Sequence, residues 1–275
     1  MKLKRFYLSI LLAWLGFGGT VPAQEVAPDL TAINALITQI NADLAAGKHT
    51  EPELAADLHQ FDVLLAQTNL SPVVAAYILM QKGIVYDQVL QNPIKAIATF
   101  QAIQTNYPGT AVASHMDEAI KSLEPQAAKQ KIRESLAPGT LFPDFSGKDL
   151  SGQPLSVAQF RGKVVLLDFW ATWCPPCRRE LPNVVSVYNK YHAQGFEIIG
   201  VTLDDNLALL NSFIKDSKMP WPEHFEGQGW NNTLTTKYGV SAIPDNILID
   251  AQGRILGRNL SGDDLAQAVA KALAK

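Results

Sequence analysis

The sequence predicts an α/β domain in the C-terminal half of the chain, preceded by an all-helical domain. From residue 164, patterns occur in the order strand, helix, strand, helix, strand, strand, helix, whereas residues 29–135 carry helical patterns only. The 275 residues, 47% hydrophobic and 18% charged, can bury the cores of about two domains. A formal net charge of −3 gives no basic surface for nucleic acid, which we therefore do not expect as a partner.

Residues 1–23 have the features of a secretory signal peptide. A basic head of Lys2, Lys4 and Arg5 precedes the apolar stretch Phe6 to Phe17, and the segment ends at Val21-Pro22-Ala23. An uncleaved membrane anchor is the alternative, but the stretch is shorter than the roughly 20 residues that a membrane span requires. We expect a periplasmic or otherwise exported protein, soluble after cleavage, with 20 basic and 26 acidic residues and a net charge of −6.

Residues 24–123 are predicted to form the helical domain. Thr50-x-x-Glu53 is a capping box, and Ser71 and Asn92 each precede a proline, which is typical of a first helical turn. The predicted helices are Leu30 to Ala45, Leu54 to Ala66, Pro72 to Leu90, Pro93 to Asn106 and Thr110 to Leu123. Residues 124–137 are polar and are the predicted linker to a second domain at 138–275.

The middle of the helical domain carries a pattern close to that of a tetratricopeptide repeat. It comprises Gly83, Tyr86, Ala96, Phe100 and Pro108, with one extra residue between Tyr86 and Ala96. Such a repeat implies a surface that binds a protein partner. The alternative is a generic helical bundle.

The second domain begins with a strand that is buried on both faces. Val164 to Trp170 is a nearly continuous apolar run, and the helix that follows, Arg178 to Gln194, has apolar residues at helical spacing. Residues 220–232 look like an insertion near the site, either a partner-binding lip or a loop packing its own aromatic residues. The remaining predicted elements are a strand at Phe196 to Thr202, a helix at Leu207 to Lys218, strands at Asn246 to Asp250 and Arg254 to Arg258, and a C-terminal helix capped near Ser261 to Asp263.

The only two cysteines, Cys174 and Cys177, lie at the start of the predicted helix. A disulfide that closes so short a loop removes little entropy from the unfolded chain, so a structural staple explains the pair poorly. A zinc site needs further ligands, and the five histidines include no pair at a ligand spacing. Reversible dithiol chemistry is therefore the favoured interpretation, and we expect neither a metal nor another cofactor.

Residues 138–275 contain a set of segments that follow the pattern of a known family: Leu141-Phe142-Pro143-Asp144-Phe145, Asp149-Leu150-Ser151-Gly152, Leu155 to Phe160, Arg161 to Pro182 with Trp173-Cys174-Pro175-Pro176-Cys177 inside it, Tyr238-Gly239-Val240, Ile243-Pro244 and Leu248-Ile249-Asp250. With these segments, residues 138–275 resemble the TlpA/ResA-like thioredoxin proteins, a family with a redoxin (AhpC/TSA-like) domain. The resemblance implies a thioredoxin fold with an extra N-terminal hairpin, in an exported oxidoreductase that exchanges disulfides with proteins. It also implies a cis peptide at Ile243-Pro244, facing the cysteines where a partner's backbone docks.

The position of Cys174 indicates that it is the nucleophile. The positive end of the following helix dipole lowers the pKa of its thiol, and the more enclosed Cys177 would then resolve the mixed disulfide. Neither Pro175 nor Pro176 has an N–H to stabilise the thiolate, so we expect a mild pKa depression and a reducing site. Trp173 is expected to cover the sulfurs and to form the docking surface with these prolines and Ile243-Pro244.

Two acidic residues are further candidates for the catalytic site. Asp168 lies within the buried run, where a neutral carboxyl is favoured, and it matches the buried aspartate of thioredoxins, which implies a proton acceptor for Cys177. A hydrogen-bonded structural role is the alternative. Glu180 matches the glutamate of ResA-like proteins, the alternative being a solvated first-turn glutamate. Trp170 is expected in the core, and Asp245-Asn246, where the family usually has Thr, is expected to alter the docking surface.

The favoured function is therefore an exported thiol-disulfide oxidoreductase that reduces protein disulfides and is regenerated by a membrane electron donor. A redox-inactive module that binds a partner through its helical half is the main alternative. A thiol peroxidase is disfavoured because the Pro-x-x-x-Thr-x-x-Cys loop is absent.

Overall fold

The computed structural model describes residues 30–274, so the predicted signal peptide lies outside the described residues. The chain divides into two compact units between Ala127 and Ala128. No helix within residues 30–274 combines the length and the apolar character that crossing a membrane requires.

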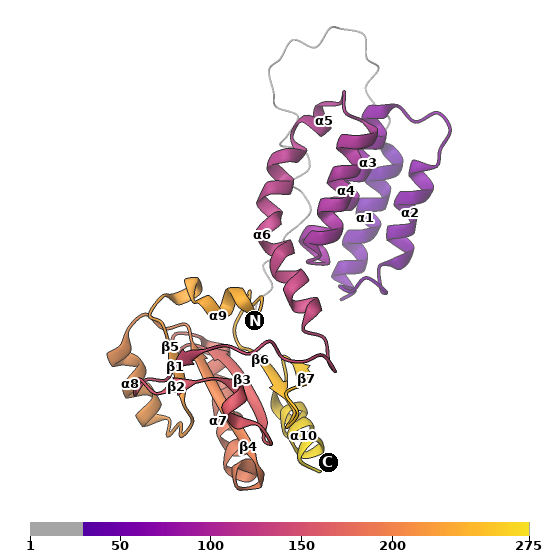
Figure 1. Cartoon of the computed structure of the whole chain (residues 1–275). Coiled ribbons are helices and arrows are strands. Elements are labelled where there is room, and N and C mark those ends of the chain that lie inside the picture. Colours follow the sequence, from indigo (N-terminus) through magenta and orange to yellow (C-terminus); the bar gives the residue numbers. More distant parts are fainter. Residues whose placement is uncertain (1–29, 275) are drawn as a thin grey trace. The chain divides into compact units, whose positions relative to one another are not determined.

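The first unit is all-helical, as predicted (Figure 1). The Oγ of Ser71 accepts a hydrogen bond from the Val74 N–H, and Asn92 Oδ1 accepts one from the Lys95 N–H, so both predicted caps form. The predicted helix Pro72 to Leu90 changes to a π-helix in its last turns. The elements are α1 (Thr31–Ala45), α2 (Ala55–Leu65), α3 (Pro72–Ile84), π-helix η2 (Val85–Val89), α4 (Pro93–Asn106), α5 (Ala111–Ser114) and the first part of α6 (Met116–Ser135).

Helix α3 contributes to both hydrophobic cores of this unit. Its Ile78 packs in a cluster with α1 and α2, and its Ala76 packs in a second cluster with α4, α5 and α6. Gly83 permits the close approach of α3 to α4, because a Cβ atom there would lie 2.2 Å from Cε1 of Phe100. Two residues of the tetratricopeptide pattern therefore form a close contact between these helices.

Helix α6 differs from the prediction, because it continues through most of the residues expected to form a linker. It ends at Ser135, and Pro125 lies inside it. The polar composition of residues 124–137 suggested a linker, but Leu123 and Ala127 are buried on one face of the helix. Ile132, on another face, packs against the core of the second unit.

The second unit has a five-stranded mixed sheet in the order β5-β4-β3-β6-β7. Strands β3, β4 and β5 are parallel, and β6 and β7 are antiparallel to their neighbours. A hairpin of β1 (Gly147–Lys148) and β2 (Pro154–Leu155) precedes the sheet, as the resemblance implied. The sheet strands are β3 (Val164–Trp170), β4 (Phe196–Thr202), β5 (Glu223–Phe225), β6 (Asp245–Ile249) and β7 (Ile255–Arg258).

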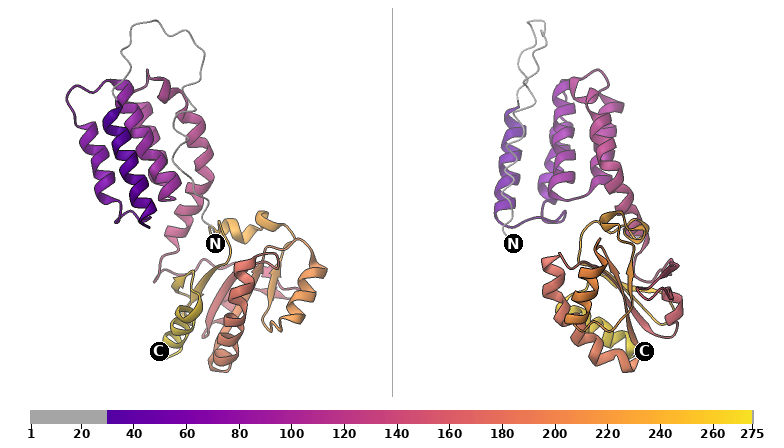
Figure 2. Two further views of the ribbon diagram at one scale, coloured as in Figure 1. Left: turned by 180° about the vertical axis from the view of Figure 1, so that it is seen from behind. Right: turned by 90° about the vertical axis from the view of Figure 1, so that its left-hand side faces the viewer.

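Helices α7, α8 and α10 cover one face of this sheet, and the hairpin lies on the other (Figure 2). Side chains alternate along β3, so Trp170 packs on Phe213 of α8, whereas Phe169 packs against Tyr238 on the opposite face. Asp168 shares its face with Trp170 and therefore points towards α7. The elements are 3₁₀ helix η3 (Val157–Phe160), α7 (Pro175–Tyr191), η4 (His192–Gln194), α8 (Leu207–Asp216), η5 (Gly229–Asn231), α9 (Thr233–Lys237) and α10 (Gly262–Leu273).

The segment predicted as an insertion, residues 220–232, contains the edge strand β5. Thr202 of β4 pairs with Phe225, and Gly200 pairs with Glu223. The strand was missed because its three residues, Glu-His-Phe, have no apolar alternation, and its glutamate is 2% exposed.

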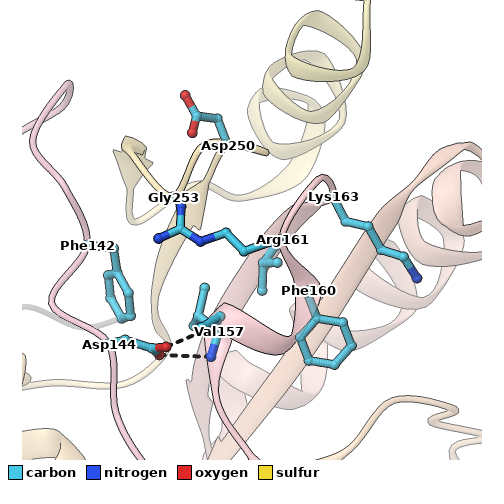
Figure 3. A pocket seen from close by; sticks show the side chains of 10 residues that line it. Phe142, Asp144, Val157, Phe160, Arg161, Lys163, Asp250 and Gly253 are labelled. Atoms are coloured by element: carbon cyan, nitrogen blue, oxygen red, sulfur yellow. Dashed lines mark hydrogen bonds between the residues drawn. The ribbon is translucent and has the colours of Figure 1, made fainter.

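A small cavity of about 20 Å³ lies where the segment before the hairpin meets β7 (Figure 3). The Asp144 carboxylate accepts hydrogen bonds from the N–H groups of Val157 and Ala158, both at 2.9 Å, and so fixes the start of η3. The Arg161 guanidinium lies over Gly253, where a Cβ atom would be 2.3 Å from Nη1. Neither cysteine lines this cavity, which serves the packing of the domain.

Candidate active site

The loop between β3 and α7 is held in place by Asp204, a residue that follows β4. Its carboxylate accepts hydrogen bonds from the Thr172 N–H at 2.9 Å and from the hydroxyls of Thr172 and Thr202. Because β3 and β4 are parallel, their C-terminal ends meet at one edge of the sheet, and Asp204 reaches the loop there. The loop that presents the cysteines is therefore rigidly supported.

Cys174 and Cys177 form a disulfide at the N-terminus of α7. Cys174 is the N-cap residue, and its Sγ accepts a hydrogen bond from the Cys177 N–H at 3.2 Å. This is the first backbone N–H after the two prolines, as the sequence predicts. The expected difference in enclosure is absent, because Cys174 and Cys177 are 3% and 5% exposed. Position at the helix terminus, and not exposure, distinguishes the two sulfurs.

The Ile243-Pro244 peptide is cis, which confirms the expectation from the resemblance. The carbonyl oxygen of Ile243 lies 3.7 Å from the Sγ of Cys174, so this loop borders the disulfide. Pro244, Pro175 and Trp173 are exposed, and Ile243 and Pro176 are half-buried. The five residues predicted to dock a substrate therefore remain accessible around a buried disulfide.

Asp245 and Asn246, which are expected to alter the docking surface, are themselves buried. They are 2% and 6% exposed. The Asp245 carboxylate forms a bidentate ion pair with Arg258, at 2.8 Å to Nε and 2.7 Å to Nη2. The Asn246 side chain donates to the Leu260 carbonyl and accepts from the Leu260 N–H. These residues support the cis-proline loop from inside, because Arg258 at the end of β7 and Leu260 just after it supply their partners.

Asp168 and Cys177 line the same cavity of about 140 Å³. Trp170, Glu180 and Pro244 also line it. Burial, with the nearby carboxylates of Asp245 and Glu180 adding to the effect, raises the pKa of Asp168 to about 7. Its carboxyl accepts no hydrogen bond from residues 30–274, which is the contact that a purely structural role requires. The cavity therefore contains Cys177 together with a carboxyl whose pKa is raised.

Glu180 is half-buried, so it is not the solvated first-turn residue considered as its alternative. Its Oε1 accepts hydrogen bonds at 2.7 Å from the Gly262 N–H, at the start of α10, and from Asn183 Nδ2. Glu180 therefore joins α7 to α10 while lining the cavity that contains Asp168. It contributes negative charge beside Asp168 and fixes the cavity wall.

Glu223 is a second buried carboxyl near the site, and the sequence analysis missed it. Its two oxygens each accept an indole N–H at 2.9 Å, from Trp170 and Trp221. Burial raises its pKa to about 8, despite these hydrogen bonds, and the charge of Asp168 adds to the effect. Gly200 makes room for it, because a Cβ atom there would lie 2.1 Å from the carboxylate. Glu223 thus holds Trp170 against the cavity.

The aromatic residues around the cysteines are divided between the core and the surface. Trp170 and Trp221 are 4% and 5% exposed, so Trp170 serves the core, as predicted. Trp173 is 49% exposed, and its ring centroid lies 6.5 Å from that of Trp230, which is 42% exposed. The segment after β5 therefore brings an aromatic side chain to the edge of the site.

Comparisons with known proteins agree with this geometry. Residues 138–257 match the AhpC/TSA family. The ResA thiol-disulfide oxidoreductase of Bacillus thuringiensis subsp. konkukian is 31% identical over 142 residues, covering 52% of this chain and 80% of the relative. ResA of Geobacillus thermodenitrificans is 33% identical over 123 residues, or 45% of this chain and 69% of the relative.

A solved structure with a similar domain is the thioredoxin domain of a thiol-disulfide oxidoreductase from Bacteroides vulgatus. It is 34% identical, covers 50% of this chain and 97% of that one, and has a TM-score of 0.46. The residues matched by the family, 138–257, include the cysteine pair and the cis-proline. The chain therefore belongs to the TlpA/ResA-like thioredoxin family and is a thiol-disulfide oxidoreductase.

Proposed function

We propose that this protein is exported and reduces disulfides of client proteins through Cys174 and Cys177. The observation that carries the proposal is a disulfide at a helix N-terminus whose second cysteine shares a cavity with Asp168. The first cysteine has the helix dipole and the Cys177 N–H to stabilise a thiolate. The second has a carboxyl with a pKa of about 7 to accept its proton.

In the first step, the Cys174 thiolate attacks one sulfur of the client disulfide. A bond forms between the two sulfurs, the client S–S bond breaks, and the other client sulfur leaves as a thiolate that takes a proton from water. The exposed surface of Trp173, Pro175, Pro176, Ile243 and Pro244 is suited to hold the client backbone during this attack.

In the second step, Cys177 gives its proton to the Asp168 carboxylate and attacks Cys174 Sγ. The internal disulfide forms, the mixed disulfide breaks, and the released client thiolate is protonated. Two electrons have then passed from the cysteine pair to the client. A membrane-attached dithiol donor returns two electrons to Cys174–Cys177 and completes the cycle.

The location outside the cytoplasm is proposed from the sequence of residues 1–23. We expect the mature exported protein to begin at Gln24, which N-terminal sequencing of the periplasmic fraction would reveal. The helical unit is proposed to bind a protein partner, because Gly83 and Phe100 of the tetratricopeptide pattern make a close helix contact.

Reduction of insulin by dithiothreitol tests the proposed activity. The wild-type protein is expected to accelerate precipitation of the insulin B chain, and Cys174→Ser is expected to abolish the acceleration because the attacking sulfur is gone. A protein that only binds partners would give identical traces with and without wild-type protein. A parallel peroxide-consumption assay would reveal thiol peroxidase activity instead.

A further inference from the structure

We propose that Trp230 is a specificity-determining residue, which favours client disulfides with an aromatic side chain next to the attacked cysteine. The inference rests on the proposed function, because it concerns how the client of Cys174 is chosen. It is carried by the aromatic surface that Trp230 forms with Trp173 beside the disulfide.

The exposure of Trp230 sets it apart from other aromatic residues of the same segment. Trp221 is 5% exposed and Phe225 packs against the main core, whereas Trp230 keeps 42% of its surface in solvent. Its neighbour Trp173 is 49% exposed. Large aromatic side chains left adjacent on a surface indicate an interaction site, because water is an unfavourable environment for both rings.

The backbone that carries Trp230 is held by hydrogen bonds, so the point from which its ring projects is fixed. The hydroxyl of Thr235, a fully buried residue, donates to the Asn232 carbonyl at 2.7 Å and lies 3.2 Å from the carbonyl oxygen of Trp230. Asn232, which is 1% exposed, caps α9 through a hydrogen bond from the Leu234 N–H at 2.9 Å. Glu226 fixes the other side of the turn by accepting from the N–H of Thr233. A pre-organised aromatic ring loses little entropy when it binds.

The position of the pair relative to the cysteines defines what it contacts. Trp173 precedes Cys174 directly, and the Trp173 and Trp230 rings are tilted by 56° with centroids 6.5 Å apart. When a client cysteine is bonded to Cys174, its neighbouring residue is about 3.3 to 3.6 Å further along the client chain. We expect that residue to reach the two rings, where an aromatic side chain gains stacking and loses water contact.

Two matched peptide disulfides test this proposal, one with Phe and one with Ser beside each cysteine. Pre-reduced protein is mixed with each peptide, and the second-order rate constants are measured by chromatography of the products. Wild type is expected to prefer the Phe peptide by about fivefold, in keeping with aromatic pair energies of about 0.5–1.5 kcal/mol. Trp230→Ala is expected to lose this preference, and Trp230→Phe to keep most of it.

Leu141→Ala is the matched control, because it truncates another large exposed side chain, 62% exposed, that pairs next to β7 at the opposite edge of the sheet. It is expected to keep the wild-type preference. A preference that survives in Trp230→Ala, or is absent from wild type, overturns the proposal. The simple substrate bis(2-hydroxyethyl) disulfide, which has no aromatic group, separates a failure of the Trp230 proposal from a failure of the proposed disulfide reduction. If wild type does not reduce it, the proposed function itself fails.

Discussion

Asp168 is the residue at which stability and chemistry oppose each other. The pKa of this half-buried residue is raised to about 7 in the folded protein from an ordinary value of 3.8, because its carboxyl is shielded from water and lies near Asp245 and Glu180. The folded state therefore holds a proton that the unfolded state releases above pH 3.8. Stability contributed by this group is complete at acidic pH, falls as the pH rises from about 4 to 7, and then levels off.

Substitution of Asp168 by Asn should remove the loss of folding stability that accompanies the rise in pH. We expect Asp168→Asn to be more stable than wild type at pH 8 by on the order of a few kcal/mol, since each pKa unit corresponds to about 1.4 kcal/mol. At pH 4 the two proteins should differ little. Urea unfolding of the oxidised proteins at both pH values measures the difference.

The control for this prediction is Asp205→Asn, at an exposed carboxyl after β4, which should follow the wild-type pH curve. A difference between Asp168→Asn and wild type that is the same at pH 4 and pH 8 would contradict the assignment. Part of the wild-type decrease in the free energy of unfolding with rising pH should remain in Asp168→Asn. Glu223 also has a raised pKa, of about 8, and its contribution falls between about pH 4.5 and 8.

The residue scale also explains the departure from the family at Asp245. A buried carboxylate is costly unless it is paired, and Arg258 satisfies both of its oxygens. The sequence alone did not reveal this pair, because the two residues lie 13 positions apart on adjacent antiparallel strands. The ion pair can be recognised only once the pairing of β6 with β7 in the sheet is known.

At the scale of elements, the start of α7 determines how readily the cysteine pair is reduced. Pro175 and Pro176 leave Cys177 as the first residue whose N–H donates to Cys174 Sγ. We therefore expect a reduction potential near the reducing end of the known range, about −270 mV. A midpoint near −120 mV would contradict this interpretation.

Pro176→Ala adds one backbone N–H at the helix terminus. Stabilising the thiolate by a charge-assisted hydrogen bond should shift the potential to less negative values by about 30 mV, which corresponds to about 1.4 kcal/mol. Redox titration against glutathione measures the shift. Pro182→Ala, later in the same helix, is the control and should leave the potential unchanged. Equal shifts in both variants would show that helix stability, and not the added N–H, is responsible.

The contact between α3 and α4 can be tested by a single methyl group. Gly83→Ala places a Cβ atom 2.2 Å from the buried ring of Phe100, so the helical unit should lose about 1–3 kcal/mol of stability through overpacking. Thermal unfolding of the full chain, followed by circular dichroism, measures the loss. Gly109→Ala, where no atom lies within 4 Å of the new Cβ, should be nearly neutral. Similar effects of the two changes would contradict a close packing role for Gly83.

At the scale of the whole molecule, the local sequence pattern predicted most elements. The apolar run of β3, the strand β4 and the proline-initiated helix α4 have the predicted bounds. Strand β5 was missed because a glutamate such as Glu223 is usually a surface residue. Here Glu223 is buried, and two indole N–H groups donate hydrogen bonds to its carboxyl oxygens. The second half of α6 was read as a linker from its composition. Prediction from the local sequence pattern fails where residues distant in the sequence determine whether a side chain is buried.

The candidate site was predictable to a similar extent. Cys174, Cys177 and Asp168 are close in sequence, so the motif and the buried run were sufficient to find them. The supporting residues Glu223 and Arg258 come from other strands and Asp204 from the segment after β4, and no short motif marks them. Trp230 was within a segment considered as a partner-binding lip, but only the position of its ring next to Trp173 indicated a specific role.

Trapping of a mixed disulfide tests most directly whether Cys174 is the attacking sulfur. Reduced Cys177→Ala, mixed with an oxidised peptide substrate, should gain the mass of one peptide chain on Cys174, since no second thiol can release it. Reduced Cys174→Ala should remain largely unmodified over the same time at pH 7. Rapid modification of Cys177 in Cys174→Ala, together with an inert Cys174 in the other variant, would contradict the account.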